Sequence, residues 1–179
     1  PSTSSAASDV YKRQVQHGGK AMSYLNVYDA EAAWRLVHQF GDPTSVVIKH
    51  ANPCGVASAN TIDEAYYLAH NCDPVSAFGG IVAVNRPVTQ TIAESLAPVF
   101  TEVVIAPSYE EGALEVLTAK ANLRVLSAER PDGRRFDLRP IEGGMLVQTT
   151  DDVPVDIENW SVVTDAKPTD EQWDDIKFA

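Results

Sequence analysis

A lysine and a histidine, Lys49 and His50, stand side by side at the end of the short apolar run 46–48. A histidine titrates near neutral pH and can act as a general base, while a lysine ammonium can stabilise a developing oxyanion or hold a phosphate. Because neighbouring strand residues point to opposite faces, both side chains reach one site only where the strand ends. The turn-forming residues 51–55 provide such an end, with Asn52 able to bond its own turn. The simpler interpretation, two solvated polar side chains at a strand end, stays open.

Two further stretches carry groups that can bind a ligand. Residues 76–80 read Ser-Ala-Phe-Gly-Gly, which combines accessible N–H groups with one aromatic face for a planar ring. A Gly-Gly pair before a strand is also typical of an ordinary turn. Glu102 stands next to the apolar run 103–105, where a carboxylate can accept hydrogen bonds from a ligand amide or amine. An exposed charge at a strand end is an equally good interpretation of Glu102.

A zinc site has to be considered because of His50, Cys54 and Cys72. Zinc nucleoside deaminases combine His-x-Glu with Pro-Cys-x-x-Cys, whereas here Ala-Asn follows His50 and Gly-Val-Ala follows Cys54. We therefore predict that the chain binds no metal. Nothing in the sequence indicates a lowered thiol pKa, so we interpret Cys54 as structural. The chain also has no Gly-x-Gly-x-x-Gly or Walker motif, which leaves dinucleotide or nucleoside triphosphate binding by those routes without support.

Apolar periodicity predicts helices and strands in alternation along the chain. Thr61 and Ser108 each begin a capping-box pattern, and Asn26 or Asp29 can cap the first helix. We predict helices over 30–40, 61–71, 89–96 and 108–120, strands over 45–50, 80–84, 102–106, 123–126 and 144–148, and a surface excursion or hairpin over 127–142. This alternation predicts an α/β fold in three layers, a mostly parallel sheet with helices on both faces. In such sheets ligands bind beyond the carboxyl ends of the strands.

Composition narrows the class of protein. The chain has 179 residues, of which 44% are hydrophobic, and a formal net charge of −11. Length and apolar content predict one globular domain, or one and a half, with a buried core. No apolar run approaches the roughly 18 residues of a membrane span, the negative charge disfavours nucleic-acid binding, and two cysteines are too few for a disulfide scaffold. We therefore expect a soluble, cytosolic protein that binds neither nucleic acid nor membranes.

The first fourteen residues differ from the rest of the chain. Residues 1–14 are rich in serine and alanine, show no periodicity and lack an initiator methionine. We interpret them as a non-native or disordered tail and take residues 15–179 as the domain. The last helical pattern also stops without a closing loop, so we expect the domain to be truncated at both ends.

Four motifs occur together in the order 19–24, 49–55, 73–80 and 102–107. They read Gly-Lys-Ala-Met-Ser-Tyr, Lys-His-Ala-Asn-Pro-Cys-Gly, Asp-Pro-Val-Ser-Ala-Phe-Gly-Gly and Glu-Val-Val-Ile-Ala-Pro. From about residue 15 onward the chain resembles the transformylase part of the family that joins phosphoribosylaminoimidazolecarboxamide (AICAR) formyltransferase to IMP cyclohydrolase. The resemblance implies a cytidine-deaminase-like α/β fold without the zinc. It also implies formyl transfer from 10-formyltetrahydrofolate, a co-substrate, to the 5-amino group of AICAR in purine biosynthesis, by a homodimer that uses no metal.

The resemblance further implies roles for individual residues. Lys49 and His50 match the catalytic pair of the family. His50 would be the general base for the AICAR amine, and Lys49 would stabilise the tetrahedral intermediate and assist the departing folate nitrogen. The implied substrate-binding residues are Phe78, Gly79, Glu102 and Asn52, and the implied folate-binding residues are Val75, Ser76 and Phe78.

The same resemblance implies an incomplete site. The family's cyclohydrolase domain, a phosphate-binding segment upstream of Gly19 and the second half of the transformylase have no counterpart in this sequence. The family builds its sites across the dimer interface. Because the loss of positioning groups can lower a rate by many powers of ten, we expect this chain to have little or no activity alone. Two alternatives stay open: a non-catalytic α/β ligand-binding or interaction fragment, and a zinc nucleoside deaminase relative.

Overall fold

The computed structural model describes residues 14–131, 133, 136–151 and 155–179. The predicted tail lies outside these residues except for its last member, Gln14, which begins a strand. The chain divides into two compact units, Pro1–Asp132 and Gly133–Ala179, and each is described by itself. Within the described residues, no helix has both the length and the apolarity needed to cross a membrane.

The first unit contains a six-stranded sheet and the helices that cover it. Its elements are β1 (Gln14–Gly18), α2 (Tyr24–Val37), β2 (Thr44–Lys49), β3 (Asn52–Ser58), α3 (Ile62–Cys72), α4 (Pro74–Ala77), β4 (Ile81–Val84), α5 (Gln90–Leu96), β5 (Val103–Ala106), α6 (Glu111–Thr118) and β6 (Arg124–Ala128). The sequence pattern predicted neither β1, β3 nor the short helix α4. The other helices and strands of this unit were predicted, with ends that differ by a few residues.

The six strands lie in the order β1-β6-β5-β4-β2-β3. Strands β4, β5 and β6 are parallel neighbours, whereas β2 is antiparallel to both β4 and β3, and β1 is antiparallel to β6. The strands β3, β4, β5 and β6 therefore share one direction, and β1 and β2 run the opposite way. The predicted mostly parallel sheet is confirmed in this sense, but its two outer regions are built from antiparallel pairs.

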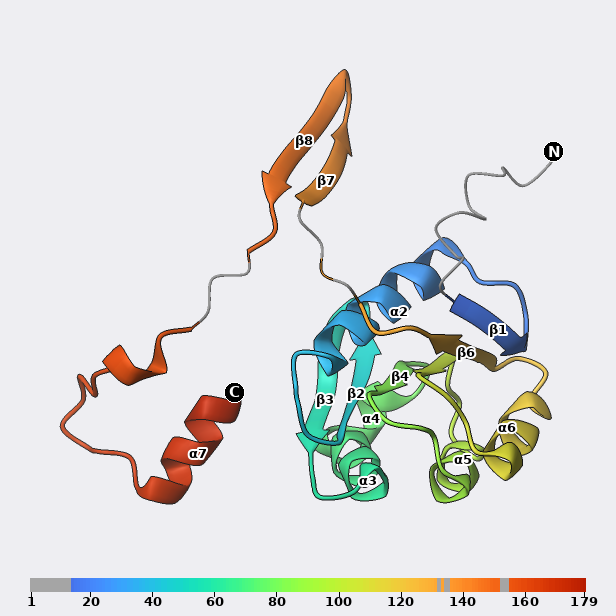
Figure 1. The fold of residues 1–179 in the computed structure, drawn as a ribbon, viewed down its shortest axis with the longest axis horizontal. Coiled ribbons are helices and arrows are strands. Elements are labelled where there is room, and N and C mark those ends of the chain that lie inside the picture. The colour runs from blue at the N-terminus through green and yellow to red at the C-terminus, as the bar shows by residue number, and fades with distance from the viewer. Residues whose placement is uncertain (1–13, 132, 134–135, 152–154) are drawn as a thin grey trace. The chain divides into compact units, whose positions relative to one another are not determined.

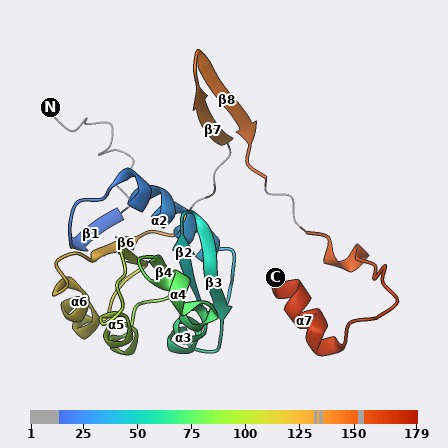
Figure 2. The same cartoon turned by 180° about the vertical axis from the view of Figure 1, so that it is seen from behind.

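Alternating side chains along the strands face two separate clusters of buried residues. On one face, Val46 and Ile48 of β2 pack with Ala33 and Trp34 of α2. On the other face, Val47 packs in the cluster formed with α3, α5 and α6. Figures 1 and 2 show α2 on one face of the sheet and α3, α5 and α6 on the other. The predicted three-layer α/β architecture is therefore confirmed.

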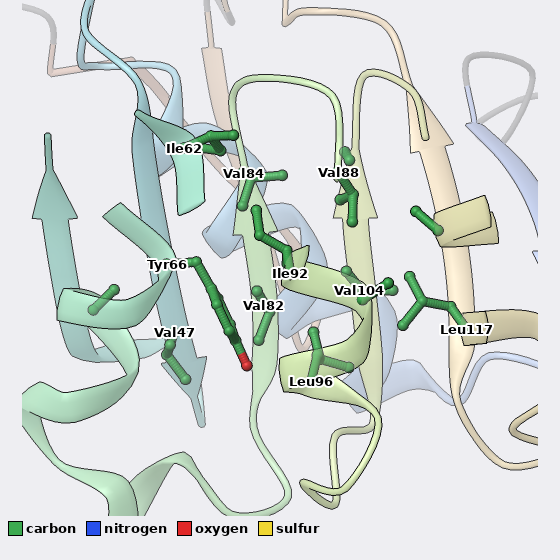
Figure 3. Close-up of a cluster of buried hydrophobic side chains, with 14 of the residues drawn as sticks. Val47, Ile62, Tyr66, Val82, Val84, Val88, Ile92, Leu96, Val104 and Leu117 are labelled. Carbon is green, nitrogen blue, oxygen red and sulfur yellow. The ribbon is translucent and has the colours of Figure 1, made fainter. Parts of the chain in front are cut away.

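The larger cluster fills the space between the sheet and helices α3 and α5 (Figure 3). Tyr66 of α3 lies beside Val47 and Val82, and Ile92 and Leu96 of α5 lie over the same side of the sheet. Both of these α5 side chains are at most 1% exposed. Burying a side chain of this size stabilises the fold by about 1.5–3 kcal/mol, so these contacts hold α3 and α5 against the sheet.

The turn predicted over residues 51–55 is wrong in extent. The chain reverses at two residues only, and Asn52 already pairs with Lys49 as the first residue of β3. Strand β3 lies at the edge of the sheet, where Pro53 is tolerated because its nitrogen need not donate to a neighbour. The register shifts between Val47 and Ile48, so that Cys54 is the extra residue of a bulge. An edge position and a bulge thus accommodate residues that are otherwise typical of a loop.

Helix α2 begins earlier than predicted. Its N-cap is Ser23, whose hydroxyl accepts from the N–H of Asn26 at 3.1 Å. The side-chain oxygen of Asn26 in turn accepts from the N–H of Ser23 at 3.1 Å, which completes a capping box. Neither predicted cap is therefore the N-cap, and Asp29 lies in the second turn of the helix.

Helix α6 begins later than predicted. Its N-cap is Glu110, with no side-chain hydrogen bond, so the capping box predicted at Ser108 is wrong. Instead Tyr109 forms an isolated parallel bridge with Val88. The N–H of Val88 donates to the carbonyl of Ser108 at 3.0 Å. This pairing keeps the chain extended for two residues longer than the local pattern indicates. At Thr61, by contrast, the predicted cap of α3 is confirmed.

The second unit contains β7 (Phe136–Ile141), β8 (Gly144–Thr149), the short 3-10 helix η1 (Ile157–Asn159) and α7 (Asp170–Phe178). Strands β7 and β8 form a separate antiparallel hairpin. The predicted strand over 144–148 is confirmed, but it pairs only with β7 and not with the main sheet. None of the described residues of β7, β8 or α7 is buried.

Candidate functional site

The predicted site residues lie at one end of the main sheet. Ile48 of β2 pairs with Ile81 of β4, which pairs with Val103 of β5, so Lys49 and Glu102 lie at the same end, two strands apart. This end is the carboxyl end of β2 but the amino end of β4, β5 and β6, because β2 runs antiparallel to β4. The predicted placement beyond the carboxyl ends of the strands is therefore right for β2 and wrong for the parallel strands. We call this end the Lys49 edge, with Lys49, His50, Asn52, Phe78, Gly79 and Glu102.

His50 and Ala51 form the two-residue turn between β2 and β3. Their φ angles are +56° and +60°, as a type I′ turn requires at both central positions. Asparagine and glycine are the usual residues there, because left-handed backbone costs other residues about 1–2 kcal/mol each. The turn therefore holds two strained residues, one of which is the predicted general base. Strain of this kind clusters at sites where a protein needs a side chain in one orientation.

Two side chains bond both backbone polar groups of His50. Its N–H donates to Oδ2 of Asp29 at 3.2 Å, and its carbonyl accepts from Nδ2 of Asn52 at 2.9 Å. The bond to the Asp29 carboxylate is charge-assisted and therefore offsets part of the strain of the left-handed turn. The hydrogen bond from Asn52 to the His50 carbonyl agrees with the predicted role of Asn52 in orienting the turn. Asp29 was not among the predicted site residues.

Lys49 reaches back to the segment before β4. Its Nζ donates to the carbonyl of Phe78 at 2.9 Å. The ring of Phe78 is 60% exposed and lies 5.2 Å from the ring of Phe100, tilted by 46°. The next residue, Gly79, has a φ of +75° and donates its N–H to the carbonyl of Phe100 at 2.7 Å. The ammonium and an accessible aromatic ring thus share one short segment, an arrangement suited to a planar, polar ligand.

Val75 and Ser76, the predicted folate-side residues, lie in α4. The N–H and the hydroxyl of Ser76 donate to the two carboxylate oxygens of Asp73 at 2.9 and 2.5 Å, so Asp73 caps this helix. These bonds, the hydroxyl bond foremost, lower the pKa of Asp73. The Ser76 hydroxyl is therefore engaged in the cap, while the 86% exposed side chain of Val75 offers apolar surface.

Glu102 is paired with an arginine at the Lys49 edge. Its Oε2 forms an ion pair with Nη1 of Arg124, whose Nε also donates to the carbonyl of Ala21 at 3.3 Å. The side chain of Glu102 is 33% exposed and that of Arg124 only 11%. The carboxylate therefore remains accessible to a ligand amide, but the buried guanidinium shares it. This pairing was not predicted, because Arg124 lies 22 residues away in the chain.

The cysteines do not form a metal centre with neighbouring groups. The described residues contain no cluster of three His, Cys, Asp or Glu side chains suited to a metal ion. Cys54 and Cys72 are free thiols. The Sγ of Cys54 contacts the carbonyl of Val47 at 3.4 Å, and partial burial raises the pKa of its thiol. A raised pKa disfavours the nucleophilic thiolate, which agrees with the structural interpretation of Cys54.

The sequence around Asp29 contains a pattern from which a role near the site could have been predicted. Residues 29, 33 and 37 share one face of a helix, and Ala33 and Val37 are fully buried. A carboxylate at the first position of such an apolar stripe needs a hydrogen-bond donor. The sequence pattern alone names no donor, because the N–H of His50 lies 21 residues away in the chain.

The fold and the site define a three-layer α/β protein whose polar residues gather at one end of its sheet. The family model described as "AICARFT/IMPCHase bienzyme" matches residues 2–179, and the chain belongs to this family. The family resemblance predicted from the four sequence motifs is thereby confirmed.

Similar curated proteins are named bifunctional purine biosynthesis protein PurH. The one from Thermoanaerobacter sp. (strain X514) is 47% identical over 161 residues, which cover 90% of this chain and 32% of the relative. The one from Staphylococcus saprophyticus is 50% identical over 157 residues, which cover 87% of this chain and 32% of the relative. The chain thus spans about a third of the length of the curated relatives it matches.

Among solved structures, "Acinetobacter baumannii RibD, form 1" is similar over 55% of this chain and 34% of its own. Its TM-score is 0.40 and its sequence identity 15%, so it carries no argument about fold or function here.

Proposed function

We propose that this chain carries the formyl-transfer chemistry of a purine biosynthesis enzyme. The reaction moves a formyl group from 10-formyltetrahydrofolate to the 5-amino group of AICAR. The observation that carries the proposal is the placement of His50 in a strained turn directly after Lys49, in a chain of the AICARFT/IMPCHase family. Backbone strain at a histidine is expected where the direction of its imidazole matters.

His50 serves as the general base. Its side chain is exposed at the turn, so its imidazole can accept the proton that the 5-amino group loses as its nitrogen attacks the formyl carbon. This amine is a weak nucleophile, and a well-placed general base contributes about 10²–10⁴-fold to a rate. The neutral imidazole is the active form, which is why a histidine suits a reaction near neutral pH.

Lys49 supplies the fixed positive charge. Its ammonium stabilises the negative charge that develops on the formyl oxygen and assists the departing folate nitrogen. The bond from Nζ to the Phe78 carbonyl supports this role, because it holds the ammonium at the Lys49 edge. Removing a donor of this kind typically lowers a rate by about 10²–10³-fold.

The remaining predicted residues form the binding surface. Phe78 and Gly79 contact AICAR, Glu102 accepts hydrogen bonds from its carboxamide region, and Asn52 orients the catalytic turn. Val75, Ser76 and Phe78 face the folate. The exposed side chains of Val75 and Phe78 support this assignment, since both offer apolar surface and the carbonyl of Phe78 accepts from Lys49.

Three broader features belong to the same proposal. The family resemblance implies a cytidine-deaminase-like fold without the zinc, and neither zinc motif is complete in the sequence. As in its family, the protein works in the cytosol as a homodimer. It uses 10-formyltetrahydrofolate as co-substrate and no metal.

A chimera tests the proposal. Residues 15–179 replace the matching third of the Thermoanaerobacter relative, and two reactions are followed: formyl transfer to AICAR and ring closure of the formylated product. We expect His50→Ala in this chimera to lower kcat for formyl transfer by about 10²–10⁴-fold and to leave ring closure unchanged. The control is Glu115→Gln, at an exposed carboxylate of α6.

The two reactions separate the competing functions. If His50→Ala impairs ring closure and spares formyl transfer, the segment belongs to the cyclohydrolase and the proposal is wrong. If neither reaction changes, the Lys49 edge is a non-catalytic surface.

A further inference from the structure

The backbone N–H of His50 is bonded by a residue that lies outside the β2–β3 hairpin. Lys49 and Asn52 form the last pair of the β2–β3 ladder, so the polar groups of the two turn residues have no ladder partners. Water would normally satisfy such groups in an exposed turn. Here the carbonyl of His50 is bonded by Asn52 within the hairpin, and its N–H is bonded by Asp29 of α2 at 3.2 Å.

The carboxylate of Asp29 is fixed in an unusual way. Its Oδ1 is buried and has no hydrogen-bond partner among the described residues, while Oδ2 accepts from His50. An aspartate that served only as a solvated surface charge would expose both carboxylate oxygens to water, because a buried unpaired oxygen is unfavourable. The helix dipole favours an acidic side chain only in the first turn of a helix, and Asp29 lies beyond that turn of α2. Its position in the helix therefore gives no other reason for the charge.

The position of Asp29 is set by the core. Its neighbour Ala30 is 1% exposed, and Ala33, one turn on, is fully buried. Both pack with Val46 and Ile48 of β2, the strand that leads into the turn. Helix α2 and strand β2 therefore present the carboxylate and the histidine to each other as parts of one packed layer.

We infer that Asp29 is the positioning residue of His50: its carboxylate fixes the left-handed turn and, through it, the direction of the imidazole. The inference rests on the proposed function for its catalytic meaning, because only a working His50 needs to be positioned. Asp29 itself touches the backbone of His50 and not the reacting atoms.

Nuclear magnetic resonance on the isotope-labelled 179-residue chain tests the contact without any turnover. We expect Asp29→Ala to speed exchange of the His50 amide by about tenfold or more, and to move the backbone carbon shifts of residues 50 and 51 away from positive φ. Asp29→Asn keeps an acceptor oxygen and should retain the turn, with a shifted His50 amide signal. Glu115→Gln, the exposed control, should change neither signal.

Either of two results would overturn the inference. One is a His50 amide whose exchange and backbone shifts are the same in Asp29→Ala and in the unaltered chain. If Asp29→Ala does not fold, Asp29→Asn decides: an unmoved His50 amide signal there shows that the bond does not exist.

The chimera described above tests the catalytic meaning. We expect Asp29→Ala to lower kcat for formyl transfer by about 10–100-fold, with KM for AICAR little changed, and Asp29→Asn to restore most of the rate. A rise in KM at constant kcat would contradict a positioning role. If the chimera with the unaltered segment transfers no formyl group, the proposed function fails, while the resonance experiment still decides whether Asp29 holds the turn.

Discussion

Among the single residues, His50 and Ala51 have the most constrained backbone, because both lie in the left-handed turn between β2 and β3. Both residues have positive φ angles, and only one of them has a side chain with chemistry to perform. The left-handed conformation of Ala51 costs about 1–2 kcal/mol. Its left-handed backbone is therefore imposed by the hairpin that presents His50.

Ala51→Gly should stabilise the protein. Glycine adopts positive φ without the steric penalty of a Cβ, so we expect the free energy of unfolding to rise by about 0.5–1 kcal/mol. Urea denaturation measures this directly. Ala97→Gly is the matched control: Ala97 has a φ of −53°, and there the same change should destabilise. Equal losses of stability in both variants would contradict the left-handed turn.

The two cysteines should differ in reactivity. Cys72 is exposed, whereas Cys54 is half-buried and burial raises the pKa of its thiol. Because the thiolate is the reactive form, iodoacetamide at pH 8 should alkylate Cys72 first. Mass spectrometry of peptides at early time points measures the order. Faster modification of Cys54 would show an activated thiol and revive a chemical role for it.

Sequence reasoning could place Lys49 and His50 at a strand end, because an apolar run followed by Asn-Pro marks that end. It could not give the backbone conformation of His50. The sign of φ depends on the pairing of Lys49 with Asn52, and the bond to Asp29 depends on the packing of a helix 21 residues away.

At the scale of elements, β3 and α3 approach each other more closely than most side chains would allow. A Cβ added at Gly55 would lie 1.9 Å from the carbonyl oxygen of Ala69, and 3.3 Å from the Cβ of Cys72. The obstacle is mostly helix backbone, which cannot move aside as a flexible side chain can. Gly55 therefore allows α3 to lie close to β3, the second strand of the hairpin that carries His50.

Gly55→Ala should destabilise the chain by about 1–3 kcal/mol or more, because either β3 or α3 must shift. Thermal unfolding followed by circular dichroism provides the measurement. Gly41→Ala is the control, since an added Cβ there meets nothing within 4 Å. A melting temperature for Gly55→Ala equal to that of Gly41→Ala would show that the two elements are not packed as closely as described.

The elements themselves were largely predictable, because apolar periodicity follows from which face each segment buries. The errors arose where a distant partner overrode a local pattern. Ser108 matches a capping box, yet its carbonyl accepts from Val88, which keeps the segment extended. The direction of β2 could not be predicted either, since its apolar run would suit either direction. The prediction therefore placed the site at the wrong end of the parallel strands.

At the scale of the whole molecule, both clusters of buried hydrophobic residues belong to the first unit. In the second unit, none of the described residues of β7, β8 or α7 is buried. Burial of apolar surface is the main source of stability. The first unit therefore builds its core from its own residues.

A chain ending at Asp132 should unfold like the complete one. We expect a cooperative transition with a melting temperature within about 2 °C of that of the 179-residue chain. Differential scanning calorimetry compares the two. A fall of about 10 °C or more would show that residues 133–179 support the core of the first unit.

We propose that the Lys49 edge binds AICAR, and titration of AICAR into the isotope-labelled chain can detect this binding residue by residue. We predict that the amide signals that move with millimolar AICAR are those of residues 49–52, 78–80 and 102, and that His50→Ala reduces the shifts. Signals that move only at the opposite end of the sheet, or no movement at all at millimolar AICAR, would contradict the claim.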